Sequence, residues 1–269
     1  MPTLLLPPRM NEDTRRLNSA AWVREGWAVV HAQSWRLPPD IRYRPPIVVY
    51  GDPLFVDLAA SALHLAMLEP PTDWLPNLPF DLRKRNIVLT TLAGARTVSE
   101  PTFIKPAEDK SFPAGVYADS VALLAVTPGL PDDWPVLLSE PVTWEVEYRV
   151  FALDGKPMTI SPYFRDGKLV YEQLRGWLAP PEEQAEALAF ATGVLNDTST
   201  TLPSGAVLDV GIIAGRGFAV VEANPAWASG LYGCDPADAL AVVAASVCPR
   251  SDLAPSQVRF ARPAVVVEP

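Results

Sequence analysis

The most constraining feature of the sequence is a pair of apolar runs joined by a short glycine-containing turn in the last third of the chain. The first run covers residues 207–213 and is interrupted by Asp209. The second covers residues 218–224 and is interrupted by Glu222 and Asn224. This pattern predicts a β-hairpin. Because side chains alternate along a strand, Glu222 and Asn224 share one face, and Asp209 can lie opposite them on the partner strand.

Three oxygen-bearing side chains brought together by stiff strands would suit a hard cation. The carboxylates of Asp209 and Glu222 and the amide of Asn224 match Mg²⁺, which keeps part of its water shell and takes further oxygens from nucleotide phosphates. The alternative is an edge hairpin whose polar face is simply solvated. The amide two residues after the acid favours the metal site.

Composition excludes several other classes of protein. A chain of 269 residues with 49% apolar content can bury the core of one large or two to three small α/β units. The formal charge of −9 and the isoelectric point near 4.8 argue against a general nucleic-acid binder. No apolar stretch is long enough to span a membrane or to act as a signal peptide. Two cysteines form no disulfide framework, so a cytoplasmic protein is expected.

The first third of the chain alternates predicted strands with predicted helices. The strands are expected at residues 3–6, 27–30 and 47–50, and the helices at residues 11–26 and 54–68. This alternation predicts a parallel sheet with right-handed crossovers, a small Rossmann-like unit. No G-x-G-x-x-G motif follows a strand, so a dinucleotide site is not expected there.

A proline-rich segment separates this unit from the middle of the chain. Residues 70–86 hold four prolines and few periodic apolar positions, which indicates a linker. The segment ends in the basic triplet 83–85, which could face phosphate but is more often a solvated surface. At the other end of the chain, residues 264–267 could form a last strand.

A lysine at the end of a predicted strand marks the middle region. Residues 101–106 form the strand, which carries Lys105, and a loop follows over residues 107–115. Such a lysine can reach phosphates as a point charge while loop N–H groups cover them. The loop has one glycine, Gly115, so Lys110 is expected to replace part of the backbone contact. The alternative is a surface lysine at a strand end.

The next segments predict an antiparallel meander. A strand over residues 136–142 is followed by strands over residues 144–153, 157–164 and 169–172 with tight turns between them. In the second of these strands, Glu145, Glu147 and Arg149 share one face. They could serve a site or form a cross-strand ion-pair ladder.

Two arginines of the meander are candidates for anion binding. Arg149 and Arg175 could hold a γ-phosphate or an acyl substrate, because guanidinium forks match both groups. The alternative for each is a surface pair with Glu172 or Asp166.

In their order along the chain these motifs resemble those of ATP-grasp proteins. Asp209 followed 13 residues later by Glu222-x-Asn224 resembles the magnesium-binding signature of that family. Lys105-Pro106 resembles its phosphate lysine. By the same resemblance, the nucleotide-binding residues beyond Lys105 and Lys110 would be the hinge at the adenine edge, Glu140, Pro141 and Val142, and the ribose acid Glu147. The loop over 107–115 departs from the family pattern, which is rich in glycine.

The resemblance covers about residues 85–235 and implies an α/β ATP-grasp fold preceded by a Rossmann-like domain, similar to short bacterial or phage-type ATP-grasp proteins. The implied domains are a pre-ATP-grasp domain at 1–85, a small lobe at 86–140 and a large lobe with the metal site at 141–269. The implied cofactors are ATP and Mg²⁺.

The activity implied by the resemblance is that of an ATP-dependent ligase. Such an enzyme activates a small-molecule or peptide carboxylate as an acylphosphate, which an amine or thiol then attacks. The catalytic residues would be Lys105, Arg149 and Arg175. Two alternatives remain, a small-molecule phosphotransferase and a nucleotide-binding protein without catalysis. The oligomeric state is left open.

Overall fold

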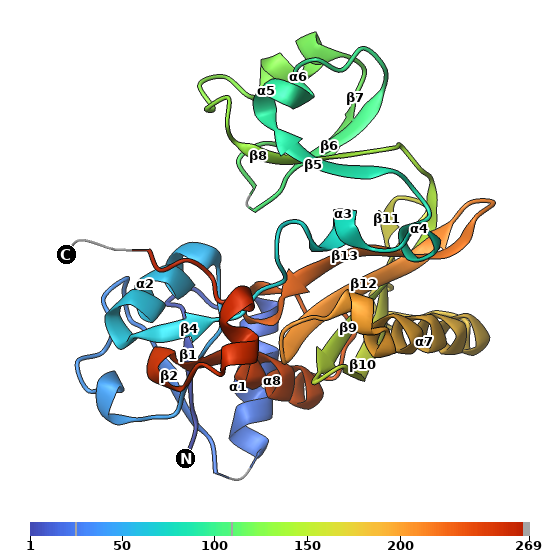
Figure 1. The fold of residues 1–269 in the computed structure, drawn as a ribbon. Coiled ribbons are helices and arrows are strands. Elements are labelled where there is room, and N and C mark those ends of the chain that lie inside the picture. The colour runs from blue at the N-terminus through green and yellow to red at the C-terminus, as the bar shows by residue number, and fades with distance from the viewer. Residues whose placement is uncertain (25, 109, 266–269) are drawn as a thin grey trace.

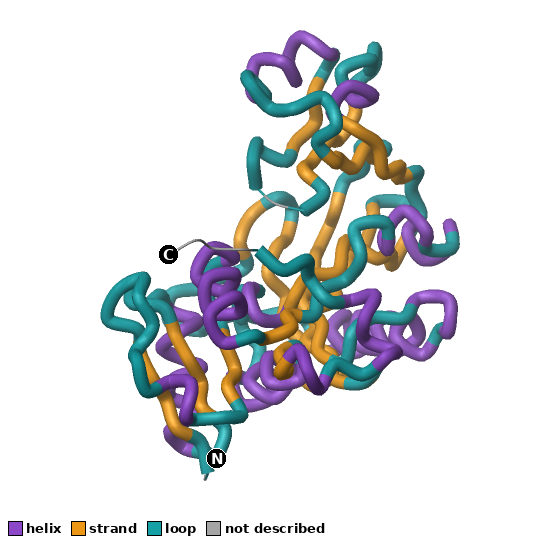
Figure 2. The backbone as a smooth tube through the Cα atoms, turned by 60° about the vertical axis from the view of Figure 1, so that its left-hand side comes forward, coloured by secondary structure: helices purple, strands orange, loops and turns teal. Residues whose placement is uncertain are grey.

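The computed structural model describes residues 1–24, 26–108 and 110–265. The chain forms an N-terminal unit, a small lobe and a large lobe, and the small lobe stands apart from the rest (Figures 1 and 2). Among the described residues, no helix is both long and apolar enough to cross a membrane.

The N-terminal unit is built on a parallel sheet, as predicted. Strands β1 (Thr3–Leu6), β2 (Ala28–His31) and β3 (Ile47–Val49) pair in the order β2-β1-β3. Helix α1 (Glu12–Val23) follows β1 and helix α2 (Pro53–Leu63) follows β3. Leu4 and Leu6 pack into the core that includes α1, while Leu5 packs into the core that includes α2. The sheet is therefore apolar on both faces, as a parallel sheet between helices must be.

Helix α2 is shorter than predicted. It ends at Leu63 because His64 adopts the left-handed conformation, with φ of 53°. The chain then forms strand β4 (Leu65–Met67), which pairs antiparallel with β14 (Val247–Pro249) near the C-terminus. The N-terminal unit is thus completed by residues from the other end of the chain.

The predicted linker at residues 70–86 is a correction. It forms two short helices, α3 (Trp74–Asn77) and α4 (Phe80–Arg83). Trp74, Leu75 and Leu78 are buried in the core of the large lobe. Few apolar positions were enough to anchor the segment, because all three pack inward, and α3 and α4 lie against strand β13 of the large lobe (Figure 1).

The small lobe is a short antiparallel sheet with two helices. Its strands pair in the order β5-β8-β6-β7. Its elements are β5 (Ile87–Thr91), α5 (Leu92–Ala95), β6 (Thr102–Pro106), β7 (Gly115–Tyr117), α6 (Ser120–Val126) and β8 (Pro135–Ser139). Ile104 and Val136 pack into the lobe's own core. Ile87 and Leu137 instead join the core of the large lobe, so one face of this sheet looks towards that lobe.

The large lobe contains the predicted meander. Its strands pair antiparallel in the order β11-β10-β9-β12-β13. They are β9 (Trp144–Leu153), β10 (Lys156–Arg165), β11 (Lys168–Leu169), β12 (Gly205–Ile213) and β13 (Gly217–Pro225). Strand β11 has two residues rather than the four expected at 169–172.

The two faces of the large sheet differ in chemistry. Helix α7 (Pro181–Asn196) covers one face, where Tyr148 and Val150 pack with Ala187 and Ala191. The alternate residues of β9 point to the other face, which carries the charged groups. Helix α8 (Pro236–Ala245) packs with α1 at the end of the sheet nearest the N-terminal unit.

The expected strand at residues 264–267 is not formed where it can be checked. Residues 264 and 265 belong to no strand, and residues 266 and 267 lie outside the described residues.

Candidate functional site

The hairpin β12–β13 brings together the three residues predicted to bind metal. Asp209 lies directly opposite Glu222 in the strand register, and Val207 lies opposite Asn224. The amide nitrogen Nδ2 of Asn224 is 3.2 Å from Asp209 Oδ2 and 2.9 Å from Glu222 Oε1. The three polar side chains therefore meet at one point on the sheet.

Asp209 is held by an arginine from the neighbouring strand. Arg149 on β9 lies opposite Asp209, with Nε 2.9 Å from Oδ1 and Nη2 2.6 Å from Oδ2. The Asp209 side chain is 0% exposed. Burial raises the pKa of Asp209, and the charge and hydrogen bonds of Arg149 act in the opposite direction. The pair is a bidentate, dry ion pair, and not the surface pair considered for Arg149.

The remaining contacts of Arg149 fix its guanidinium in place. Its Nη1 donates to the Gly230 carbonyl at 3.0 Å. Its guanidinium carbon lies 4.8 Å from the ring centre of Tyr232 and 5.4 Å from that of Tyr163. Because every guanidinium nitrogen has a protein partner, Arg149 orients Asp209 in this arrangement. A direct role on phosphate stays a prediction.

Lys105 connects the small lobe to the acids of the large lobe. It lies on β6, and its Nζ is 2.5 Å from Glu222 Oε2. The two side chains are 24% and 29% exposed. Burial alone would raise the pKa of Glu222, but Lys105, helped by Asn224 and Arg149, lowers it to about 2. Each carboxylate of the site thus has its own basic partner.

The donor set fits Mg²⁺. Two carboxylates and an amide within hydrogen-bonding distance are hard oxygen donors, and no other ligand type is needed. Among the described residues no group of three His, Cys, Asp or Glu side chains converges, because the third donor here is Asn224. Its amide offers nitrogen to both carboxylates, and a half-turn would offer oxygen instead. A cation at Glu222 would take the electrostatic place of the Lys105 ammonium.

The predicted hinge lies at the junction of the lobes. The Glu140 backbone N–H donates to the Asn86 carbonyl, and the Glu140 carboxylate accepts from Arg216 on the β12–β13 turn at 2.5 Å. The side chain of Glu140 is therefore committed to the protein. Pro141 has no N–H, and the N–H of Val142 finds no acceptor among the described residues. Val142 could therefore donate to a ligand edge at this position.

Glu147 lies on the charged face of β9, two residues before Arg149. In the register its neighbours are Gly211 on β12 and Phe164 on β10, so it is not part of an ion-pair ladder. Tyr163 donates its hydroxyl to Glu147 Oε2 at 2.5 Å. Burial raises the pKa of Glu147. The residue lines the same floor as the acid site.

Two other predicted residues are not brought to the acids. Arg175 is 71% exposed and pairs with Glu172 at 3.4 Å, which is the surface alternative. Lys110 is exposed in the loop after β6. Neither contacts Asp209, Glu222 or Asn224 in the described part of the chain.

Sequence reasoning missed several residues that build the site. Arg85 is 6% exposed and donates to the carbonyls of Val220 and Val221, while its guanidinium lies 4.9 Å from the Trp144 ring centre. The basic triplet was the available signal, but burial of one member cannot be read from the triplet alone. Asp13 also escaped notice, although its carboxylate accepts from the Leu231 N–H.

Comparison with solved structures supports the fold. D-alanine–D-alanine ligase from Bacillus anthracis is 11% identical with a TM-score of 0.56, over 91% of this chain and 97% of that one. D-cycloserine synthetase DcsG is 14% identical with a TM-score of 0.52, over 90% and 98%. A RimK domain ATP-grasp protein from Sphaerobacter thermophilus is 14% identical with a TM-score of 0.50, over 91% and 98%. At these identities the likeness concerns the fold.

Comparison with protein families identifies the chain. No curated protein matches it. Residues 82–242, more than half of the chain, match a family described as an ATP-grasp domain, the second family of its clade. The predicted ATP-grasp fold is confirmed, and with it ATP and Mg²⁺ as the cofactors of the family. The chain belongs to this ATP-grasp domain family.

Proposed function

We propose that this protein is an ATP-dependent ligase that joins a carboxylate to an amine or thiol through an acylphosphate. The observation that carries the proposal is the contact between Lys105 of the small lobe and Glu222 of the large lobe. It lies beside Asn224 and the Asp209–Arg149 pair. The arrangement gathers an ammonium and three oxygen donors where a nucleotide triphosphate would lie between lobes.

Each residue of the site has a role in this proposal. Asp209, Glu222 and Asn224 would hold Mg²⁺, which would offset the phosphate charge when bound. Lys105 would leave Glu222 and move to the phosphates as a point charge. Arg149 keeps Asp209 ionised and oriented. Val142 and the backbone of residues 140–141 would contact the adenine edge, and Glu147 the ribose.

The reaction needs two substrates besides ATP. The γ-phosphoryl group moves to a carboxylate oxygen, which yields ADP and an acylphosphate. The nucleophile then bonds to the acyl carbon, the bond from that carbon to the phosphate oxygen breaks, phosphate leaves, and the nucleophile loses its proton to solvent. The printed functions of two structural neighbours, a ligase and a synthetase, support this class of reaction.

The test is ADP release from Mg-ATP in the presence of pooled amino acids and peptides. We expect turnover in the wild-type protein and a loss of at least about 100-fold in Glu222→Gln. The matched control is Glu186→Gln, an exposed acid on α7, behind the sheet, which should leave turnover unchanged. Equal turnover in wild type and Glu222→Gln would contradict the site.

Two other outcomes would favour the alternatives. A phosphorylated acid that accumulates without ligation, whichever nucleophile is added, would indicate a phosphotransferase. Tight ATP binding without ADP release in any pool would indicate a nucleotide-binding protein.

A further inference from the structure

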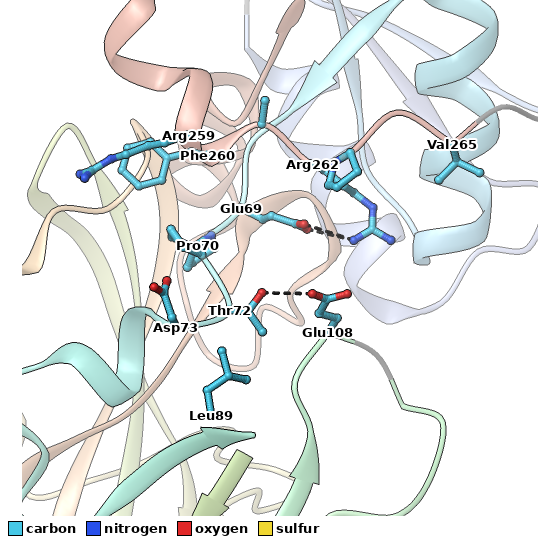
Figure 3. Close-up of a pocket in the computed structure, with 13 residues that line it drawn as sticks. Glu69, Pro70, Thr72, Asp73, Leu89, Glu108, Arg259, Phe260, Arg262 and Val265 are labelled. Atoms are coloured by element: carbon cyan, nitrogen blue, oxygen red, sulfur yellow. Dashed lines mark hydrogen bonds and ion pairs between the residues drawn. The ribbon is translucent and has the colours of Figure 1, made fainter. Parts of the chain in front are cut away.

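A cavity of about 550 Å³ lies where four separate parts of the chain meet (Figure 3). Its walls come from residues 69–73 after β4, Leu89 on β5, Glu108 in the loop after β6, and residues 259–263 with Val265 near the C-terminus. Its volume is typical of small-molecule sites. None of the residues assigned above to metal or nucleotide lines it.

The cavity lies beside the predicted phosphate site. Leu89 is opposite Leu137 in the sheet, and Leu137 is opposite Lys105. Two strand spacings place Leu89 roughly 10 Å from Lys105. Glu108 follows Lys105 by three residues. A ligand in this cavity could therefore present one end to the reacting phosphoryl group.

The charges that line the cavity are only partly neutralised. Arg262 is paired with Asp57 at 2.8 Å and with Glu69 at 3.1 Å. Asp73 accepts a hydrogen bond from the neutral amide of Asn77, and Glu108 accepts one from the hydroxyl of Thr72 at 3.2 Å. Within the described chain, neither Asp73 nor Glu108 has a basic partner. They lie on opposite sides of the cavity (Figure 3).

A basic group without an acidic partner lies at the edge of the same cavity. Arg259 extends along Phe260, with its guanidinium carbon 4.5 Å from the ring centre. It donates to the hydroxyl of Thr201, and no carboxylate among the described residues pairs with it. The cavity thus combines two free carboxylates inside with one free guanidinium at its edge.

We propose that this cavity binds the nucleophile of the reaction, and that the nucleophile is an amino acid or a short peptide. Its ammonium group would face Asp73 and Glu108, and its carboxylate would pair with Arg259, whose fork matches a carboxylate. The carboxylates would repel a purely anionic ligand. This assignment rests on the proposed ligase function, because it gives the cavity the second substrate.

The test measures binding without ATP, by saturation-transfer NMR on the full chain with pooled standard amino acids and pooled dipeptides. At least one compound should bind the wild-type protein. Its affinity should fall on the order of tenfold in Glu108→Gln and in Arg259→Gln. The matched controls are Asp133→Asn and Arg250→Gln, which change exposed charges away from the cavity and should bind normally.

The role of Arg259 is tested with an analogue of the bound compound in which an amide replaces the carboxylate. The analogue should bind the wild type more weakly, with no further loss in Arg259→Gln. Failure of all pool members to bind, or unchanged affinity in both Glu108→Gln and Arg259→Gln, would overturn the proposal.

Failure of the cavity and failure of the ligase give different results. Turnover lost in Glu222→Gln, with no pool member bound at the cavity, would contradict the cavity proposal and leave the ligase. Binding that depends on Glu108 and Arg259, in a wild-type protein that releases no ADP with any pool, would contradict the ligase and with it the role of the ligand as nucleophile.

Discussion

The two lobes reach the acid site in different ways. The large lobe provides strands β9, β12 and β13, of nine or ten residues each, paired almost residue for residue. The small lobe provides strands of three to five residues and a single side chain, Lys105. Asp209 on the large sheet is fully buried, whereas both members of the Lys105–Glu222 contact are partly exposed.

This difference separates two functions of charge. The Arg149–Asp209 pair lies inside one rigid sheet, so breaking it would leave a buried charge without a partner. The Lys105–Glu222 pair joins two bodies and keeps access to water, so it can exchange for other ions at low cost. The large lobe should therefore respond to substitution through its stability, and the small-lobe contact through its function.

The most severe test of this contrast is Asp209→Asn. The substitution leaves the Arg149 guanidinium buried without its counter-charge and should lower the free energy of unfolding by about 3–5 kcal/mol. Urea denaturation followed by circular dichroism measures the change. The paired control is Glu222→Gln, at a partly exposed acid of the same site, which should cost below about 1 kcal/mol. Equal losses for the two variants would erase the distinction.

A smaller effect is expected on the back of the large sheet, and it should depend on pH. Glu183 of α7 accepts from Arg165 at 2.5 Å and from the Tyr148 hydroxyl. Burial would raise the pKa of Glu183, but these partners outweigh it and lower the pKa. Its contribution to stability is therefore complete above the unfolded-state pKa near 4.3 and is lost as the pH falls through the folded-state value.

Glu183→Gln should lower the free energy of unfolding by about 1–2 kcal/mol at pH 7. The difference from wild type should shrink below about pH 4.5. Urea titrations over a pH series measure it, with Glu186→Gln on the exposed side of the same helix as the control. A difference that stays constant down to pH 3 would show that the ionised form of Glu183 is not what stabilises the helix.

Much of the large lobe could be predicted because its information is local. The alternation around Asp209 and the Glu222-x-Asn224 pair fixes which side chains share a face, and the tight turns fix the register. The order of the motifs then identified the fold. The parallel N-terminal sheet followed from strand–helix alternation in the same way.

The failures concern contacts between distant segments. Trp74 and Leu75 enter the core of a sheet that begins some 70 residues later, so the segment resembled a linker. Strand β4 forms by pairing with β14 from the far end of the chain, and no local pattern announces that partner. Arg149 looked like a ligand for phosphate because its partner Asp209, 60 residues away, was assigned to the metal alone. The domain boundaries, the hinge contacts and the catalytic roles of Lys105, Arg149 and Arg175 stay predictions.

The smallest expected change in stability comes from Lys105→Ala, and it isolates the contact between the lobes. Removing a partly exposed ion pair should alter the free energy of unfolding by less than about 1 kcal/mol, because water can solvate Glu222 in its place. ADP release should nevertheless fall at least about 100-fold, since the phosphates lose their point charge. The control Lys156→Ala removes an exposed lysine from β10 and should change neither quantity. A stability loss above about 2 kcal/mol would instead mean that Lys105 is part of the fold. In that case the lobes would form one rigid unit, and an ion pair that must open for a nucleotide could not be the basis of the site.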